Sequence, residues 1–312
     1  MKSEVLRLGT RRSALAMAQS IWVKERIERH DRCVHVELVP ISTKGDRILD
    51  RPLNEIGGKG LFVKEIEESL LRGDIDLAVH SMKDMPADLP EGLTLGVFPE
   101  RESPLDVMVS VHGGGLDELP EGSRVGTGSL RRCAQLRSVR PDLDILSIRG
   151  NVDTRLRKLD EGRFDAVVLA EAGLRRLGLE ARVSGVLLPF QVLPAVGQGA
   201  LGLEMRVKDS RTRDMLAFLH DEPTMIAVRA ERAFLKELNG GCQVPIGGLA
   251  VVEGSRVSFT GMVGEVDGSL IIRRTADGPC GEADFVGKSA AWSLLDAGAG
   301  EILTKAYRQC FV

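Results

Sequence analysis

Basic residues gather where helices of this sequence are expected to begin, although the helix dipole favours acidic side chains at that end. Four short segments show this pattern, each next to a serine, an asparagine or a glycine-rich turn. They are Arg11 and Arg12 before Ser13, Arg131 and Arg132 after Ser129, Arg149 and Arg155 around Asn151, and Lys59 in the turn Gly57–Gly60. Free backbone N–H groups and guanidinium groups together bind anions well, so we predict carboxylate or phosphate sites at these turns. The alternative is that these are ordinary solvated side chains.

Asp84 lies in the segment His80-Ser-Met-Lys-Asp-Met-Pro86, directly after the apolar run Ile75–Val79. The run predicts a buried strand, so Asp84 and Lys83 should lie near a strand's carboxyl end, where α/β sheets bind ligands. A carboxylate among many cations should stay ionised, which suits it to stabilise a cation or to transfer a proton. The alternatives are a turn-capping aspartate and, for His80, a histidine that packs near the core.

Cys242 lies in the loop Asn239-Gly-Gly-Cys-Gln-Val-Pro-Ile-Gly-Gly248. The flanking glycines allow backbone conformations that a bulkier residue could not adopt. The loop follows an expected helix and precedes an expected strand, so the thiol could project into a cleft. Most lone cysteines are small buried hydrophobic residues, and no nearby His or Asp indicates a cysteine-protease arrangement. A structural and a chemical role therefore both stay open.

The elements that must position these residues alternate through the first 195 positions. We expect strands over Val5–Leu8, Val34–Ile41 and Ile75–Val79, and helices over Ala14–Arg29 and Leu61–Leu71. This alternation predicts an α/β fold with a mainly parallel sheet covered by helices.

The same pattern repeats along the chain. Arg7-Leu-Gly-Thr10 returns as Arg124-Val-Gly-Thr127, and Gly73-Asp-Ile-Asp76 returns as Gly162-Arg-Phe-Asp165, in the same order. We therefore predict two related α/β lobes, at about 1–100 and 101–194. Chance similarity between glycine-containing turns is the alternative, because such turns recur in α/β folds.

The sequence changes character from Asp221 onward. We expect a helix from Pro223 to Gly240, strands over 249–252, 256–260 and 269–274, and a helix over 283–295. Glu253-Gly254 and Asp267-Gly268 are typical of hairpin turns. Residues 218–312 should thus form a smaller C-terminal α+β domain with a three-stranded antiparallel sheet, which carries the Cys242 loop.

The composition excludes several classes of protein. The chain has 312 residues, 43% of them hydrophobic, enough for two or three packed domains. Its net charge of −3 gives no reason to expect nucleic acid. Apolar runs are too short for a membrane span, and the start lacks the apolar stretch of a secretion signal. Five widely spaced cysteines, without CxxC or HExxH patterns, favour free thiols in a reducing cytosol and no metal site.

These segments together resemble the porphobilinogen deaminase (hydroxymethylbilane synthase) family. The matching stretches are LGTRRSALAMAQ, STKGD, GGKGLFVKEIE, HSMKDMP, VGTGSLRRCAQL, RGNVDTRLRKLD, AVGQGALGLE and GGCQVPIG. They occur in the family's order and cover most of the chain. Two positions depart from the family pattern: Gly128, where the family often has serine, and Glu171, which replaces a typically small residue.

The resemblance implies a three-domain fold. Two lobes would look like periplasmic-binding-protein domains, and the third would carry the cofactor loop. The segment Gly197–Leu203 would return to the first lobe, so that about 195–217 belong with 1–100. The lobes and the loop Gly57–Phe62 would have to shift as a product chain grows.

The resemblance also implies an activity, the head-to-tail condensation of four porphobilinogen molecules into hydroxymethylbilane with loss of ammonia. Cys242 matches the cysteine that holds a dipyrromethane cofactor through a thioether. Asp84 matches the catalytic carboxylate, which would stabilise the azafulvene cation left when ammonia departs. Each added pyrrole brings an acetate and a propionate, so the bound chain becomes steadily more anionic.

The resemblance assigns the remaining site residues to these acid groups and to the cofactor. They are the cations Arg11, Lys59, Lys83, Arg131, Arg132, Arg149, Arg155 and Arg176, and the hydroxyl donors Ser13, Ser81, Thr127 and Ser129. We expect a cytoplasmic monomer that acts on the small molecule porphobilinogen, with no nucleic acid, membrane or metal involved.

Two other functions remain open at this stage. A non-catalytic cytosolic sensor with a periplasmic-binding-like fold could use the same arginines to hold a small carboxylate. It would explain the two lobes but give Cys242 and the third domain no role. A different transferase could instead form a transient thioester on Cys242.

Overall fold

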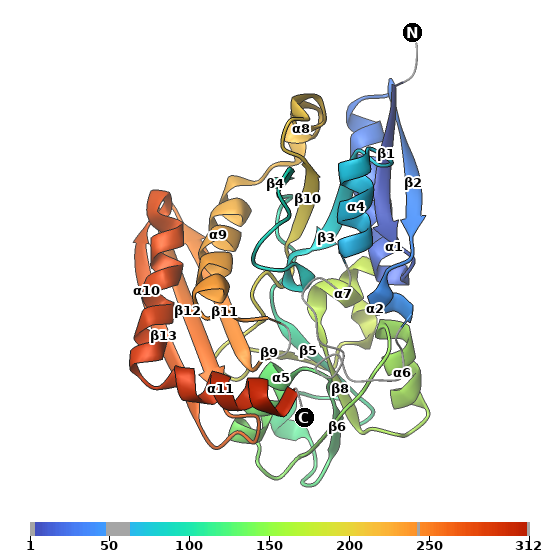
Figure 1. Cartoon of the computed structure of the whole chain (residues 1–312). Helices are drawn as coiled ribbons and strands as arrows, with labels where there is room; N and C mark the ends of the chain where they lie inside the picture. The colour runs from blue at the N-terminus through green and yellow to red at the C-terminus, as the bar shows by residue number, and fades with distance from the viewer. Residues whose placement is uncertain (1–3, 48–62, 242–243, 311–312) are drawn as a thin grey trace.

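The computed structural model describes residues 4–47, 63–241 and 244–310, and contains three sheets (Figure 1). Two five-stranded sheets form the two α/β lobes, and a three-stranded antiparallel sheet forms the C-terminal α+β part. The predicted fold class is thereby confirmed.

The first lobe is built on a sheet of order β2-β1-β3-β10-β4. Its strands are β1 (Glu4–Arg11), β2 (Val34–Ile41), β3 (Leu77–Ser81), β4 (Leu93–Val97) and β10 (Leu201–Arg206). Its helices are α1 (Ala14–His30), α2 (Lys44–Arg47), α4 (Lys64–Arg72), the 3-10 turn η1 (Met82–Asp84), α8 (Ser210–Leu216) and the 3-10 turn η4 (Ala217–Leu219).

The second lobe repeats this topology with the order β7-β6-β8-β5-β9. Its strands are β5 (Asp106–Ser110), β6 (Arg124–Gly126), β7 (Asp144–Leu146), β8 (Ala166–Ala170) and β9 (Gly185–Leu187). Its helices are α5 (Leu130–Val139), α6 (Val152–Asp160) and α7 (Glu171–Arg176), with 3-10 turns η2 (Leu116–Glu118) and η3 (Glu180–Arg182).

The prediction of a mainly parallel sheet is confirmed for each lobe, in which four of the five strands run in the same direction and one antiparallel strand is inserted. In the first lobe β1 is parallel to β2 and β3, but β10 is antiparallel to β3 and β4. In the second lobe β5 is likewise antiparallel to β8 and β9. Strand β10 enters the first sheet only after the chain has passed through the second lobe.

An equivalent ion pair in each lobe explains the repeated sequence motifs. The Arg7 guanidinium donates to Asp76 at 2.9 and 3.1 Å, and the Arg7 backbone N–H donates to the same carboxylate at 2.9 Å. Arg124 binds Asp165 in the same way, at 2.9 and 3.1 Å from the side chain and 2.7 Å from the backbone. Each pair joins a strand, β1 or β6, to the residue that precedes its parallel neighbour, β3 or β8, so the repeat is structural.

The C-terminal part packs helices on one antiparallel sheet. The strands are β11 (Ile246–Glu253), β12 (Arg256–Gly264) and β13 (Ile271–Pro279). The helices are α9 (Glu222–Glu237), the 3-10 turn η5 (Cys280–Glu282), α10 (Ala283–Asp296) and α11 (Ala299–Cys310), of which α11 was not predicted. Helices α9 and α10 cross closely at Gly287, where an added Cβ would lie 2.0 Å from the Ala230 carbonyl oxygen.

Two linkers join the lobes, residues 98–105 between β4 and β5, and residues 188–200 between β9 and β10. Helix α9 binds both linkers through Glu231, which is fully buried. Its carboxylate accepts hydrogen bonds from Arg101 Nη1 at 2.6 Å and from the Gly197 backbone N–H at 2.5 Å. The C-terminal part is therefore held against the linkers between the lobes.

Candidate active site between the lobes

A pocket that is partly open to solvent lies between the two lobes. The first lobe contributes the end of β1, the start of α1 and the segment from β3 into η1. The second lobe contributes the end of β8 and α7, and the second linker contributes Gly199. Six of the predicted site residues line it together: Arg11, Ser13, Ser81, Lys83, Asp84 and Arg176.

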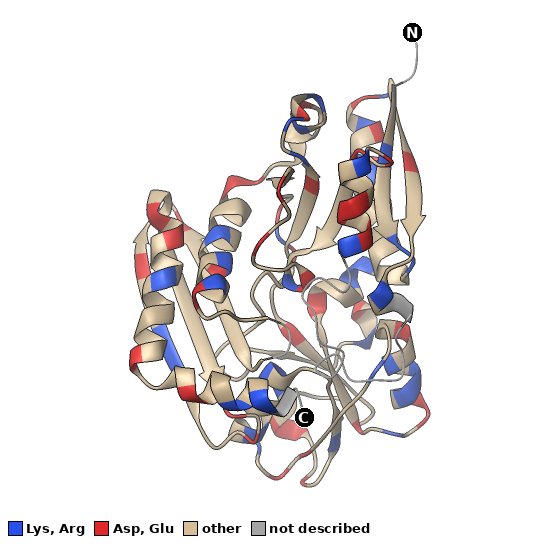
Figure 2. Ribbon diagram, viewed as in Figure 1, with Lys and Arg blue, Asp and Glu red and all other residues tan. Residues whose placement is uncertain are grey.

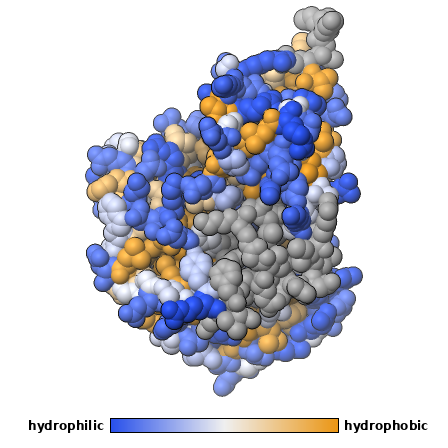
Figure 3. Space-filling model, viewed as in Figure 1, coloured by the Kyte–Doolittle hydropathy of each residue, from blue (hydrophilic) through white to orange (hydrophobic). Residues whose placement is uncertain are grey.

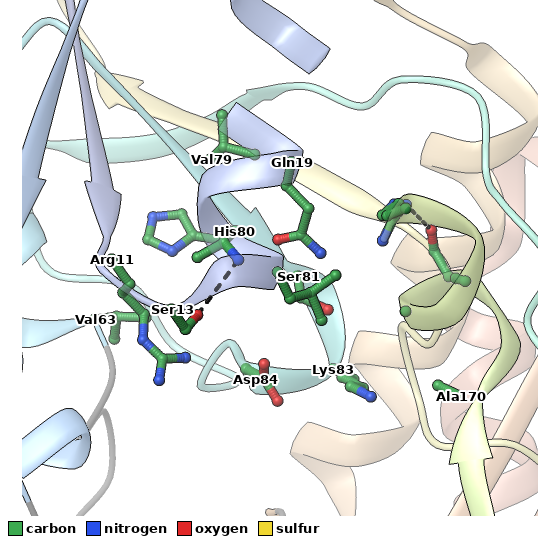
Figure 4. Close-up of a pocket in the computed structure, with 16 residues that line it drawn as sticks. Arg11, Ser13, Gln19, Val63, Val79, His80, Ser81, Lys83, Asp84 and Ala170 are labelled. Atoms are coloured by element: carbon green, nitrogen blue, oxygen red, sulfur yellow. Dashed lines mark hydrogen bonds between the residues drawn. The ribbon is translucent and has the colours of Figure 1, made fainter. Parts of the chain in front are cut away.

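Local folding explains how the first-lobe residues reach the pocket. Ser13 is the N-cap of α1, and its Oγ accepts a hydrogen bond from the Ala16 backbone N–H at 3.3 Å. Arg11 is the last residue of β1, so it projects beside that helix end. Figure 4 shows the Arg11 guanidinium and the Asp84 carboxylate directed toward the same side of the pocket.

The turn that carries Asp84 is fixed by its apolar neighbours. Met82 and Met85 are buried on either side of it, and the Met82 backbone N–H donates to the Ala200 carbonyl at 3.0 Å. Lys83 and Asp84 are therefore turned toward the pocket, as Figure 4 shows. Within 4–47, 63–241 and 244–310 no hydrogen bond or ion pair is found at the Asp84 carboxylate, but its charge acts on Lys83 and on Arg155.

Arg131 and Arg132 form a second cationic group, in the first turn of α5. Both are buried, and both bind Asp106: Arg131 Nη1 to Oδ2 at 2.7 Å, and Arg132 Nη2 to Oδ1 at 2.7 Å. From the sequence, these arginines were expected to be cations that await a bound anion. Asp106, an acidic residue at the start of the apolar strand β5, was not predicted and supplies one carboxylate to the pair.

Positive charge still exceeds negative charge around this second group. Burial lowers the pKa of Lys83, and the nearby Arg132 lowers it further, against the opposing effect of Asp84. Burial lowers the pKa of Arg155 to about 10, with Arg132 and Arg149 acting in the same direction. Such shifts arise where cations are crowded and partly desolvated. Figure 2 shows the basic positions along α5, α6 and α7.

Arg176 extends the same cationic environment on the side of α7. Burial lowers its pKa to about 10, while Glu102 acts in the opposite direction. Its Nη2 donates to the Gly199 carbonyl at 2.6 Å, which leaves it at the wall of the pocket.

An unpaired donor indicates what the cationic group can bind. Arg131 Nε is buried and has no hydrogen-bond partner among the described residues. Burying such a donor without a partner costs free energy, so the group is suited to an acceptor that the chain itself does not supply. A dipyrromethane carries several carboxylates, and this donor set fits them.

The predicted hydroxyl residues shape the turns of the second lobe. Ser129 is the N-cap of α5, and its Oγ accepts from the Arg132 backbone N–H at 3.5 Å. Thr127 is buried, and its Oγ1 accepts from the Ser129 backbone N–H at 3.2 Å. Asn151 is the N-cap of α6 but makes no side-chain capping bond. Arg149 lies two residues before Asn151, and the Lys158 ammonium donates a hydrogen bond to the Arg149 carbonyl at 3.0 Å.

Two predicted site residues, Lys59 and Cys242, lie outside the described residues. The ends of the Cys242 loop are nevertheless placed. On one side α9 ends at Glu237 and Asn239 has φ 50°, and on the other Val244 is buried in the C-terminal core.

The structure adds pocket residues that the sequence reasoning did not select. Gln19 from α1 and His80 from β3 both line the pocket. His80 is buried, and its Nε2 lies 2.9 Å from Oε2 of the buried Glu204. The alternative interpretation of His80 as a satisfied histidine near the core is therefore the one that its contacts support.

Two further observations concern the described ranges. They contain no group of three or more His, Cys, Asp or Glu residues that could hold a metal ion. None of their helices combines the length and the apolar character that crossing a bilayer requires.

The face of the molecule seen in Figure 3 is mainly hydrophilic, with smaller apolar areas.

Comparison with known structures finds low similarity over much of the chain. The periplasmic aliphatic sulphonate binding protein SsuA from Escherichia coli matches 76% of this chain and 71% of its own, with 15% identity and a TM-score of 0.38. A TRAP periplasmic solute binding protein from Desulfovibrio salexigens matches 70% and 72%, with 12% identity and a TM-score of 0.40.

Comparison of sequences is far more specific. Residues 6–214 match the family model "Porphobilinogen deaminase, dipyromethane cofactor binding domain", and residues 225–296 match "Porphobilinogen deaminase, C-terminal domain". A porphobilinogen deaminase of Syntrophobacter fumaroxidans is 52% identical over 99% of this chain and 100% of its own. One of Nitratidesulfovibrio vulgaris is 57% identical over 96% of each chain. The chain therefore belongs to the porphobilinogen deaminase family.

Proposed function

We propose that the pocket between the lobes converts porphobilinogen into hydroxymethylbilane, with Asp84 as the catalytic carboxylate. The observation that carries this proposal is the placement of Asp84 among Arg11, Lys83 and Arg176, beside a cationic group with an unpaired buried donor. A carboxylate in this position can accept hydrogen bonds from pyrrole N–H groups. The surrounding cations can hold the acetate and propionate arms.

Two sets of residues would hold the cofactor, one by a covalent bond and one by binding its carboxylates. Cys242 is the proposed attachment point, through a thioether. Arg131, Arg132 and Arg155, with Ser129 at the start of α5, would bind the cofactor's carboxylates. When bound, dipyrromethane supplies the electron-rich pyrrole carbon to which the first substrate is joined.

The chain's own residues then act on the substrate. Porphobilinogen loses ammonia from its aminomethyl group, which leaves a positively charged pyrrole ring. The Asp84 carboxylate stabilises this charge from a fixed position, so little reorganisation is needed as the charge develops. Arg11, Ser13 and Ser81 border the same space, and we assign them to the substrate's carboxylate arms.

The finer points of classification follow from the same proposal. The reaction makes the chain a transferase, and we infer a monomer that works in the cytoplasm. Light scattering of the purified protein tests the monomer, which a dimeric mass would contradict. We further assign residues 1–100 and 195–217 to the first domain, 101–194 to the second, and 218–312 to the third.

A mass measurement tests the covalent cofactor. Purified protein is denatured and digested, and the Cys242 peptide is expected to carry the mass of a dipyrrole and to react with Ehrlich's reagent. Cys133, described as a free thiol in the second lobe, provides the internal control peptide and should have its unmodified mass. A bare thiol on Cys242 in fully active enzyme would reject the covalent cofactor.

The same measurement separates the alternatives. A carboxylate sensor would have an unmodified Cys242 and would release no ammonia from porphobilinogen. A thioester-forming transferase would carry a modification that hydroxylamine removes, whereas a thioether would survive that treatment.

A further inference from the structure

Glu171 is buried at the start of α7, although long acidic side chains are rarely buried without a partner. Helix α7 contributes Ala172, Gly173 and Arg176 to the pocket wall, so whatever fixes this helix also fixes part of the site. Glu171 itself does not line the pocket, and no part of the mechanism above uses it.

Both carboxylate oxygens of Glu171 are bound. Oε2 accepts a hydrogen bond from Ser103 Oγ at 2.5 Å, and Oε1 accepts from Arg175 Nη2 at 2.6 Å and Nε at 3.0 Å. The Glu171 backbone N–H donates to the Leu105 carbonyl at 3.0 Å. Ser103 and Leu105 belong to the first linker, so the start of α7 is tied to that linker by side chain and backbone.

Glu102 closes this arrangement into a ring. Its Oε1 accepts from the Ser103 backbone N–H at 2.9 Å and from Arg175 Nη1 at 3.3 Å. Glu102 is also the carboxylate that opposes the lowering of the Arg176 pKa. The ring therefore fixes the position of Glu102, whose charge acts on Arg176. It also fixes the position of α7, the helix that carries Arg176.

The other end of α7 binds the second linker. Arg176 Nη2 donates to the Gly199 carbonyl at 2.6 Å. The two linkers are in close contact here, because a Cβ on Gly199 would lie 2.2 Å from the Glu102 carbonyl oxygen. Glu171 and Arg176 thus hold one short helix against both connections between the lobes.

We propose that Glu171 is a positioning residue: it holds α7 against the two linkers and thereby fixes the guanidinium of Arg176 in the pocket. The inference rests on the proposed function, in which Arg176 binds a substrate carboxylate. Loss of Glu171 should leave the chemistry at Asp84 intact and weaken substrate binding.

The experiment compares KM and kcat for porphobilinogen in Glu171→Val, Glu171→Gln and a matched control. Glu161→Val is the control, because Glu161 also pairs with an arginine four residues away, at 3.8 Å from Arg157, but on the exposed surface of the same lobe. Glu171→Val should raise KM about tenfold with kcat changed less than about twofold. Glu171→Gln keeps an acceptor and should restore part of the loss, and Glu161→Val should match the unmodified enzyme.

A double-mutant cycle with Arg176→Met tests whether Glu171 acts through Arg176. The KM of Glu171→Val/Arg176→Met should equal that of Arg176→Met alone, because the group that Glu171 positions is gone. If the two effects on KM multiply, or if Glu171→Val leaves KM unchanged while Arg176→Met raises it, the positioning role is wrong. An unchanged KM in Arg176→Met would instead contradict the assignment of Arg176 to a substrate carboxylate.

Thermal unfolding of each variant shows whether a change in KM reflects a general loss of structure. If Glu171→Val does not fold, Ser103→Ala removes the hydrogen bond to Glu171 and a longer one from the Leu105 backbone N–H at 3.3 Å, and should raise KM about threefold. An unchanged KM for Ser103→Ala would then contradict the proposal.

Discussion

Replacement of Asp106 by asparagine should strongly destabilise the second lobe. Asp106 is completely buried and accepts four hydrogen bonds: Arg131 Nη1 at 2.7 Å, Arg132 Nε and Nη2 at 3.1 and 2.7 Å, and Gln198 Nε2 at 2.8 Å. Asparagine has nearly the same shape, so the substitution tests charge and hydrogen bonding without opening a cavity.

The expected magnitude follows from these contacts. The oxygen of the asparagine side chain can replace one carboxylate oxygen. The NH₂ group of the same side chain then faces a guanidinium N–H, and two donors cannot form a hydrogen bond. At least one charged hydrogen bond is lost, worth about 1.5–3 kcal/mol. Two buried guanidinium groups also lose their counter-charge, and removing one partner of a buried ion pair costs about 3–5 kcal/mol in total. We therefore expect the free energy of unfolding of this lobe to fall by about 3–5 kcal/mol.

The assay must report on the second lobe. Trp22 and Trp292 lie in α1 and α10, so tryptophan fluorescence follows the other two parts of the molecule. Amide hydrogen exchange of β5, β6 and β8, measured by mass spectrometry as a function of urea, reports on the lobe itself. Asp160→Asn is the control, because Asp160 pairs with Arg182 at 2.6 Å on the exposed surface of the same lobe. That exposed pair should contribute about 0–1 kcal/mol.

A loss of less than about 1 kcal/mol in Asp106→Asn, similar to the control, would refute the reasoning. It would mean that Arg131 and Arg132 are stabilised by something other than the Asp106 charge. The assignment of Arg131 and Arg132 as partly compensated cations, able to take further carboxylates, would then be wrong as well.

Three more predictions concern catalysis, elongation and pH. Asp84→Asn should lower kcat about 100- to 1,000-fold with unfolding changed by less than about 1 kcal/mol, as measured by steady-state assay and urea titration; near-normal turnover would contradict the catalytic role. Arg149→Ala should stall cofactor assembly or elongation, seen as altered intermediates in native mass spectra, and an unaltered profile would count against its role. Burial, with the Glu204 charge adding to it, raises the pKa of Glu67 from 4.5 to about 7, so stability should fall as pH rises between these values. Glu67→Gln should flatten that slope and stabilise the protein at pH 8 by up to about 3 kcal/mol in urea unfolding, and an unchanged slope would disprove the shift.

The local pattern of the sequence determined most of the individual elements. Alternating apolar residues predicted β2 over its full length, and Ser13 and Ser129 were identified as helix caps because their side chains can satisfy free N–H groups locally. The paired motifs around Arg7 and Arg124 predicted two related lobes, since each motif encodes a contact within one lobe. Asp84 and Lys83 were selected from their place after an apolar run, which also suggested that Asp84 stabilises a cation or transfers a proton, whereas Arg176 was selected from the family resemblance alone.

Tertiary structure alone decided the contacts between distant segments. The antiparallel insertion of β10 depends on where the chain returns, which no local pattern encodes. Asp106 was not selected from the sequence, and only the fold brings it to Arg131 and Arg132, where its charge partly compensates theirs. Glu171 could not be interpreted from sequence because its partner Ser103 is 68 residues away. Side-chain type and spacing specify short-range hydrogen bonds and periodicity, whereas burial and charge compensation depend on which segments the folded chain brings together.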